Sequence, residues 1–142
     1  MVNEVKTMEL TIYEPAYYSK INGSDPNIKS FLDKISSFVV DKTYSPVIFE
    51  IMIAPVVAPK EILDQGLWDE SAKCWPSSND AAVFIHIPYK EYVNASVDEK
   101  KKLLLLSVFS AMERIEKKGK INVKQFKKDI LECLQGEIKL YE

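Results

Sequence analysis

The 142-residue chain is short of the residues on which most small catalytic and metal sites depend. It has one histidine, His86, and two cysteines, Cys74 and Cys133, which stand far apart and form no CxxC pair. These residues cannot supply the usual closed zinc sets. The four glycines make neither a dinucleotide-binding nor a Walker A pattern, so no phosphate-binding loop is recognisable. We therefore expect no metal ion, no cofactor and no catalytic residue.

Long hydrophobic runs are also missing. Nothing approaches the roughly 18 consecutive apolar residues of a membrane-spanning helix. Residues 1–13 lack the basic and apolar regions of a secretory signal. Without a secretory route, both cysteines are expected to be thiols in a reducing compartment, which predicts a cytoplasmic protein. The net charge of −2 attracts the chain as a whole to neither nucleic acid nor membrane.

What is present is the composition of an ordinary globular protein. Apolar residues make up 46% of the chain and charged residues 28%, with no internal repeat and no low-complexity tract. A chain of this length can bury a proper core. We therefore expect residues 1–142 to form a single domain.

Hydrophobic periodicity predicts three strands and three helices. Alternation indicates strands over about 8–13, 47–53 and 82–87, and Pro55 and Pro59 are expected to break the ladder after the second. Helices are predicted from Asp25-Pro26 to about residue 41, after a capping box at Ser96, and after Asn122. A short helical turn is expected near residues 61–65. The order favours an α+β fold with a small, mainly antiparallel sheet, about three helices on one face and a free polar face.

His86 is the natural candidate for acid–base chemistry. A general base needs a positioned partner, and only Cys74 could in principle provide a nucleophile. No Gly-rich oxyanion loop or nucleophile elbow accompanies either residue. An incidental or structural His86 is therefore the favoured interpretation, and a small Cys74–His86 enzyme is the alternative.

Charge is unevenly distributed along the chain. Residues 97–128 carry ten basic and four acidic side chains, which could bind phosphates but more often form a solvated helix face. Residues 61–80 carry five acidic side chains and one lysine, together with both tryptophans. Acidic groups around aromatic side chains suit a basic protein surface, although the tryptophans could equally belong to the core. The predicted partner-binding residues are Glu61, Asp64, Trp68, Asp69, Glu70 and Trp75.

The second half of the chain resembles a known family. The stretch "IHIPYKEYVNAS" combines an apolar strand, a Tyr-Lys-x-Tyr step and an Asn-Ala turn. A charged, Leu-rich helix, "VDEKKKLLLLSVFSAMERIEKK", follows it, and then a short helix, "VKQFKKDILECL". Over about residues 84–134 this pattern is similar to the C-terminal half of the immunity protein 44 family, the antidotes of bacterial polymorphic toxin systems. The resemblance implies an α+β fold, no catalysis, and inhibition of a cognate toxin by direct binding.

These observations lead to one main functional hypothesis and, besides the small Cys74–His86 enzyme, one further alternative from another class. The main hypothesis is an immunity protein, or antitoxin, that neutralises a cognate bacterial polymorphic or contact-dependent toxin. Its partner would be a basic toxin domain, with neither membrane nor nucleic acid involved, and the sequence does not indicate an oligomeric state. The alternative is a nucleic-acid or ribonucleoprotein binding module that uses the basic helices of residues 97–128.

Overall fold

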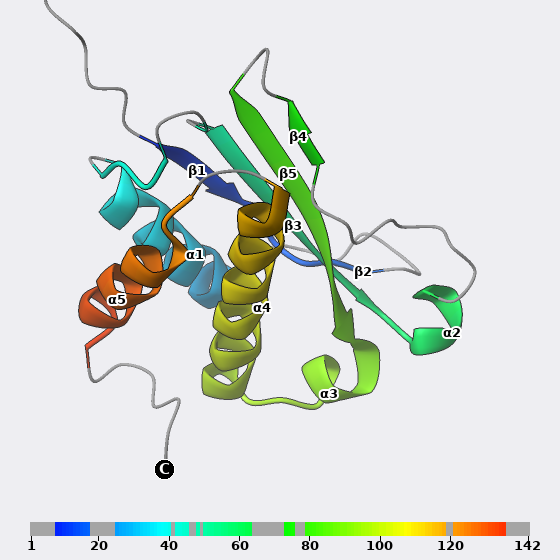
Figure 1. The fold of residues 1–142 in the computed structure, drawn as a ribbon. Coiled ribbons are helices and arrows are strands. Elements are labelled where there is room, and N and C mark those ends of the chain that lie inside the picture. The colour runs from blue at the N-terminus through cyan, green and yellow to red at the C-terminus, as the bar shows by residue number, and fades with distance from the viewer. Residues whose placement is uncertain are drawn as a thin grey trace, which may run out of the picture.

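The computed structural model describes residues 8–17, 25–40, 42–45, 48, 50–63, 73–75, 79–118 and 121–135. Three longer helices, α1, α4 and α5, lie together on one side of a five-stranded sheet (Figure 1). In chain order the elements are β1 Glu9–Ile12, β2 Ala16–Tyr17, α1 Pro26–Val39, β3 Glu50–Ala58, α2 Lys60–Leu63, β4 Lys73–Trp75, β5 Asp80–Pro88, α3 Tyr89–Val93, α4 Val97–Lys118 and α5 Val123–Cys133.

The sheet is mainly parallel, so the predicted antiparallel arrangement is wrong. Strands β1, β2 and β5 all pair with β3 in parallel, and only the three-residue β4 runs antiparallel, against β5. Parallel neighbours need a crossover of about a dozen residues or more between them. Helix α1 supplies one crossover, from β1 to β3. The second is the connection between Ala58 and Asp80, which contains β4 and is long enough to return to the starting edge.

β3 also continues further than predicted, through Pro55 to Ala58. β1 pairs with β3 only as far as Ile53, and β2 resumes the pairing at Val56. Pro55 therefore lies opposite the gap between β1 and β2, where its missing N–H removes no bond to either strand. The proline stands at a tolerated position of the sheet and does not end the strand.

The predicted helix starts are confirmed by their caps. The Asp25 carboxylate accepts a hydrogen bond from the Asn27 amide at 3.0 Å, and Pro26 occupies the first turn. The Ser96 hydroxyl accepts from the Glu99 amide at 3.2 Å. The Asn122 side chain accepts from the Gln125 amide at 3.0 Å. Each side chain satisfies a backbone N–H that has no partner inside its own helix.

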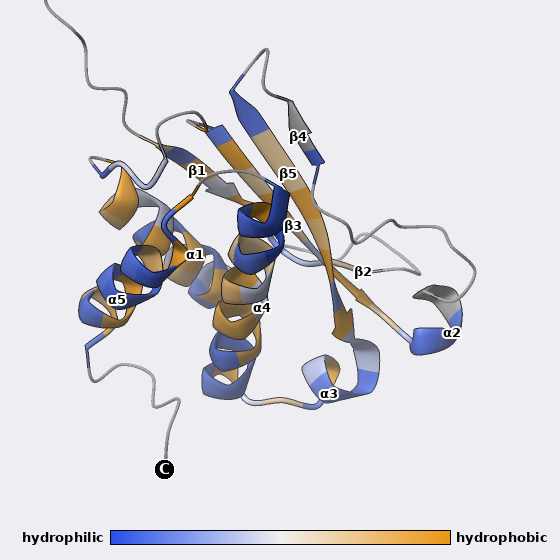
Figure 2. Cartoon of the chain, in the orientation of Figure 1, coloured by the Kyte–Doolittle hydropathy of each residue, from blue (hydrophilic) through white to orange (hydrophobic). Residues whose placement is uncertain are grey.

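The core lies between the helices and one face of the sheet. Alternate residues of β3 and β5 are buried against the helices, as Ile51, Ile53, Val83 and Ile85 show. Figure 2 shows both strands as hydrophobic over most of their length, with hydrophilic residues at their first positions. One cluster of buried side chains runs from Met8 to Leu134. The described residues thus share one core, while the single domain over residues 1–142 stays a prediction.

A polar contact fastens α5 to the segment after α1. The Tyr44 hydroxyl donates to an Asp129 carboxylate oxygen at 2.6 Å, and its ring packs edge-on against Phe126 with centroids 5.4 Å apart. Gln125 donates to the other Asp129 oxygen at 2.8 Å. Burial of the phenol, followed by the hydrogen bond to Asp129 and the charge of that carboxylate, raises the pKa of Tyr44 well above its usual range. Tyr44 is therefore a neutral donor at any physiological pH.

Candidate partner-binding site

The two faces of the sheet differ in what covers them. We call the face packed against α1, α4 and α5 the inner face, and the opposite one the outer face. Since side chains alternate along a strand, the residues next to the buried ones belong to the outer face. The outer-face residues considered below are Glu9, Thr11, Glu50, Met52, Ala54, Asp80, Ala82 and Phe84.

Three carboxylates stand side by side at one end of the outer face. Glu9 is the register partner of Glu50, and Glu50 is the register partner of Asp80. We call these three residues the acidic row. Neighbouring strands are about 4.8 Å apart, so the three negative charges are close neighbours. Among the residues described, none of the three carboxylates has an ion-pair partner.

The turn before β5 holds the acidic row in register. Asn79 has φ of 60°, the left-handed region that asparagine tolerates better than most residues. Its carbonyl oxygen accepts a hydrogen bond from the Glu50 amide at 3.3 Å. The bond joins the first residue of β3 to the residue before Asp80, so two carboxylates distant in sequence start their strands together.

Beyond the acidic row the outer face is apolar and partly open. Phe84 lies between the buried Val83 and Ile85, yet 45% of its surface is exposed. Its register partner on β3 is Ala54, a small residue beside which the ring projects. Tyr13, which follows β1 and donates its N–H to the Ile53 carbonyl, is 50% exposed.

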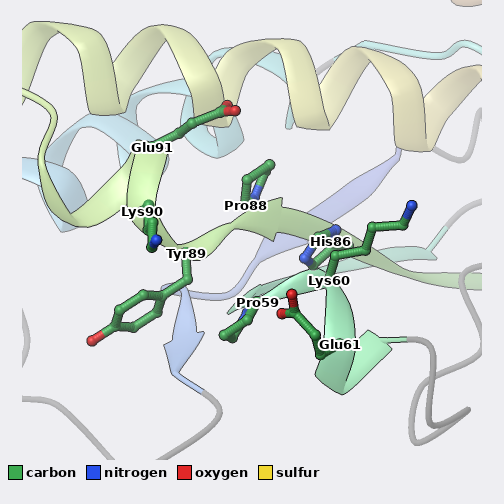
Figure 3. Close-up of a pocket in the computed structure, with 8 residues that line it drawn as sticks. All are labelled: Pro59, Lys60, Glu61, His86, Pro88, Tyr89, Lys90 and Glu91. Carbon is green, nitrogen blue, oxygen red and sulfur yellow. The ribbon is translucent and has the colours of Figure 1, made fainter.

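A pocket with a volume of about 540 Å³ lies at the other end of the sheet, where β3 and β5 finish. In Figure 3, Lys60 and Glu61 lie on the same side of it as His86, while Tyr89 points away from them. The lining combines two lysines and two glutamates with a histidine, a tyrosine and two prolines, so it presents no single charge. Its residues are Pro59, Lys60, Glu61, His86, Pro88, Tyr89, Lys90 and Glu91.

His86 is engaged with the backbone of the neighbouring strand. Its Nε2 lies 2.6 Å from the carbonyl oxygen of Ala58, the last residue of β3. Because a carbonyl can only accept, Nε2 carries the proton and donates. The contact ties the end of β5 to the end of β3, a structural role that agrees with the favoured interpretation of this residue.

The alternative Cys74–His86 pair is separated by the strand register. Cys74 is the partner of Ala81, five residues before His86 on β5. At about 3.3 Å per residue these positions are about 17 Å apart along the strand. A nucleophile and its base must come within hydrogen-bond reach of each other. The backbone arrangement therefore does not bring Cys74 and His86 together.

The basic helices are partly occupied by contacts within the protein. The Lys100 ammonium lies over the Tyr92 ring at 5.3 Å, and that of Lys101 over Phe31 at 5.7 Å. Lys127 forms an ion pair with Glu113 and lies over the Phe109 ring at 5.7 Å. Among the described basic side chains of residues 97–128, Lys100, Lys101 and Lys127 thus have ring partners, which favours a solvated structural surface over a nucleic-acid site.

Only part of the predicted partner-binding segment can be placed. Glu61 is exposed on α2 and lines the pocket at the end of the sheet. Trp75 ends β4, where its register partner is Asp80. Asp64, Trp68, Asp69 and Glu70 lie outside the described residues. The register places Trp75 and Glu61 at opposite ends of β5, so these two residues do not meet.

Sequence reasoning did not identify Glu9 and Glu50 as site candidates. Each is a single acidic residue at the start of a strand, and only the parallel register brings them beside Asp80. No local spacing in the sequence predicts such a row, because its members come from three separate segments. The signal that was available is the alternation of residues 82–87, which places Phe84 on the face opposite Val83 and Ile85.

The described residues contain neither a metal-binding cluster nor a membrane-spanning helix. No three His, Cys, Asp or Glu side chains among them come together in a way that could hold a metal ion. No helix in the described part of the chain has the length and apolar character needed to cross a membrane.

Comparison with known proteins decides the family. The family model described as immunity protein 44 matches residues 8–136, which is most of the chain. The chain belongs to the immunity protein 44 family. The resemblance noted over about residues 84–134 is thus confirmed and extends through the N-terminal half. No curated protein and no solved structure gave a significant match.

Proposed function

We propose that this chain is an immunity protein that binds a cognate toxin domain directly and blocks it without catalysis of its own. The observation that carries the proposal is the family match over residues 8–136. Two features of the site support it. His86 is bonded to the Ala58 carbonyl, and the register keeps Cys74 away from it. The sheet also presents an outer face with exposed aromatic and acidic side chains, which suits a protein partner.

The partner is proposed to be a basic domain, as toxin domains that attack nucleic acid commonly are. An acidic surface would then be complementary in charge and would speed association. The acidic segment of residues 61–80 remains part of this proposal. It joins β3 to β5, and its last residue, Asp80, belongs to the acidic row.

The test is a titration of toxin activity. The probe is the purified toxin domain encoded by the gene next to that of this chain. An inhibitor that works by binding abolishes activity at a fixed stoichiometric ratio, whereas an enzyme that inactivates the toxin does so at ratios far below one. We expect a linear loss of activity that ends at a stoichiometric ratio.

Two controls separate binding from chemistry. His86→Gln should neutralise within a few-fold of the wild type, because the histidine has a structural contact and no proposed chemical role. A chain denatured beforehand should not protect. Inactivation at substoichiometric amounts that disappears in His86→Gln would contradict the proposal, as would the absence of any effect on the toxin.

A further inference from the structure

We propose that the outer face of the sheet is the toxin-binding surface, with the acidic row of Glu9, Glu50 and Asp80 holding a basic patch of the toxin and Phe84 as the apolar anchor. This inference rests on the proposed function and specifies which surface performs it. The three carboxylates are register partners on adjacent strands, and Phe84 lies on the same face of β5 as Asp80, four residues further on.

The acidic row lowers the stability of the unbound protein. Like charges directly opposite one another on neighbouring strands destabilise a sheet. Among the described residues of this sheet the nearest cation by register is Lys73, which pairs with Ala82 and so stands one row away from Asp80. Arginine or lysine side chains of a partner would remove the repulsion and gain charge-assisted hydrogen bonds. The row is therefore a surface that a basic protein stabilises on contact.

Phe84 lies in the middle of β5, on the same face as Asp80. Large aromatic side chains in the middle of a sheet usually pack under a covering layer, but Phe84 is 45% exposed. Its partner Ala54 and the neighbouring Ala82 on the same face are small, so the ring stands above its surroundings. An aromatic side chain raised between small residues, with charges at its rim, has the arrangement of a binding hot spot.

The chemistry of the face selects the class of occupant. A nucleic acid would bring phosphates against three carboxylates and be repelled. A metal ion finds no suitable ligand set among the described residues. A basic protein surface satisfies both features at once, because its cations meet the row while an apolar side chain meets Phe84. We therefore assign the face to a basic toxin surface and not to a second copy of this acidic face.

The experiment compares two triple variants with the same change in net charge. The site variant carries Glu9→Gln, Glu50→Gln and Asp80→Asn. The control variant carries Asp33→Asn, Glu116→Gln and Glu132→Gln, three exposed acidic residues on α1, α4 and α5. Binding of the purified neighbouring-gene toxin domain is measured by calorimetry at two salt concentrations, together with the thermal midpoint of each chain.

We expect the site variant to bind at least tenfold more weakly, with a reduced salt dependence, and the control to stay within about twofold of the wild type. Phe84→Ala should lower affinity by a similar factor at either salt concentration. The thermal midpoints should not fall, because charge repulsion is relieved. If one triple variant failed to fold, the single Glu50→Gln change would be compared with Glu132→Gln.

Failure can be assigned to one of the two claims. Wild-type binding that the site variant and Phe84→Ala leave unchanged would overturn the outer-face assignment and leave the immunity function standing. Equal weakening by the two triple variants would also overturn it, because net charge alone would then explain the loss. A wild-type chain that neither binds nor neutralises the toxin would overturn both claims.

Discussion

The inner and outer faces of the same strands differ in charge at the strand starts and in how far their apolar side chains are buried. On the inner face, Ile51 and Ile53 are fully buried, and Val83 and Ile85 are 3% exposed. On the outer face the same two strands present Glu50, Asp80 and the half-exposed Phe84. A parallel sheet is usually covered on both faces, and its strands are then continuously apolar. β3 is apolar from Ile51 to its end and buried on both faces from Pro55 onward, so the partly exposed section of the outer face lies at Glu50–Ala54 of β3 and Asp80–Phe84 of β5.

The difference indicates how stability and binding are divided in this fold. Buried apolar area on the inner face supplies the main stabilising term, since each buried aliphatic side chain contributes about 1.5–3 kcal/mol relative to exposure. The acidic row contributes nothing of that kind and costs free energy through repulsion. Substitutions on the two faces should therefore separate cleanly into those that unfold the protein and those that change its binding.

The largest expected effect is a difference in the free energy of unfolding between substitutions at two adjacent residues of β5. Ile85→Ala should lower the free energy of unfolding by about 2–5 kcal/mol, because it leaves a cavity in the inner-face core. Phe84→Ala removes a larger side chain but should cost about 1 kcal/mol or less, because nearly half of the ring is already in water. Urea unfolding of both variants measures the difference. Equal losses would show that the outer face is covered and would remove its availability as a docking surface.

The second effect concerns the helix layer behind the inner face. Tyr44→Phe removes the hydrogen bond to Asp129 and should cost about 1.5–3 kcal/mol at neutral pH, as expected for a bond to a charged group. The pKa of Tyr44 is raised above its ordinary value of 10.0. The neutral phenol therefore stabilises the fold fully below that pH, and this contribution is lost as the pH rises from there toward the raised pKa.

Unfolding curves across alkaline pH test this prediction. The difference in stability between wild type and Tyr44→Phe should be constant from pH 7 to about pH 10 and then shrink. Ile130, a fully buried apolar side chain of α5, offers a control position without a hydroxyl. Ile130→Val should shift the curve by the same amount at every pH. A Tyr44→Phe difference that does not change up to pH 11 would show that the hydroxyl is not the stabilising group.

A smaller effect is expected at the turn that aligns the acidic row. Asn79 has a positive φ, so Asn79→Ala should be about 1 kcal/mol less stable than Asn79→Gly, because glycine adopts that φ without steric cost. The Glu50 amide bond to the Asn79 carbonyl is a backbone contact and survives in both variants. Thermal unfolding of the pair is the measurement. Alanine as stable as glycine would indicate that the turn does not hold the left-handed conformation in solution.

The sequence predicted those features of the fold that depend on residues close together in the chain. Asp25, Ser96 and Asn122 were recognised as caps because each acts on an amide two or three residues away. The direction of β5 was missed because it depends on the path of residues 59–79, where no long helical pattern marks a crossover. The direction of β1 was missed because the predicted helix after it was not recognised as a crossover to β3. The alternation of residues 82–87 places Phe84 on the face opposite Val83 and Ile85, and the structure shows it exposed.

The candidate site required the register as well. The acidic row exists only once β1, β3 and β5 are parallel and aligned, so an antiparallel sheet would have placed Glu9, Glu50 and Asp80 differently. The charge of residues 61–80 was visible in the sequence. That charge led to the prediction of a contiguous binding segment. The structure places the last residue of the segment, Asp80, in a row with Glu50 and Glu9 from two other strands. Family resemblance carried the function further than the residues did, because a binding surface needs no motif.

The smallest predicted effect distinguishes repulsion within the acidic row from simple surface charge. Glu50 is the middle member of the row, so Glu50→Gln should raise the free energy of unfolding by about 0.2–1 kcal/mol, the usual scale for cross-strand pairs. Glu132→Gln, on the exposed side of α5, should leave it unchanged. Added salt screens exposed charges over a Debye length of about 3 Å at 1 M, against about 10 Å at 0.1 M. The gain from Glu50→Gln should therefore diminish at high salt.

A Glu50→Gln protein that is less stable than the wild type would mean that Glu50 makes a favourable contact in the free protein. The acidic row would then have a structural role, and its weakened binding after substitution could no longer be read as loss of contact with the toxin.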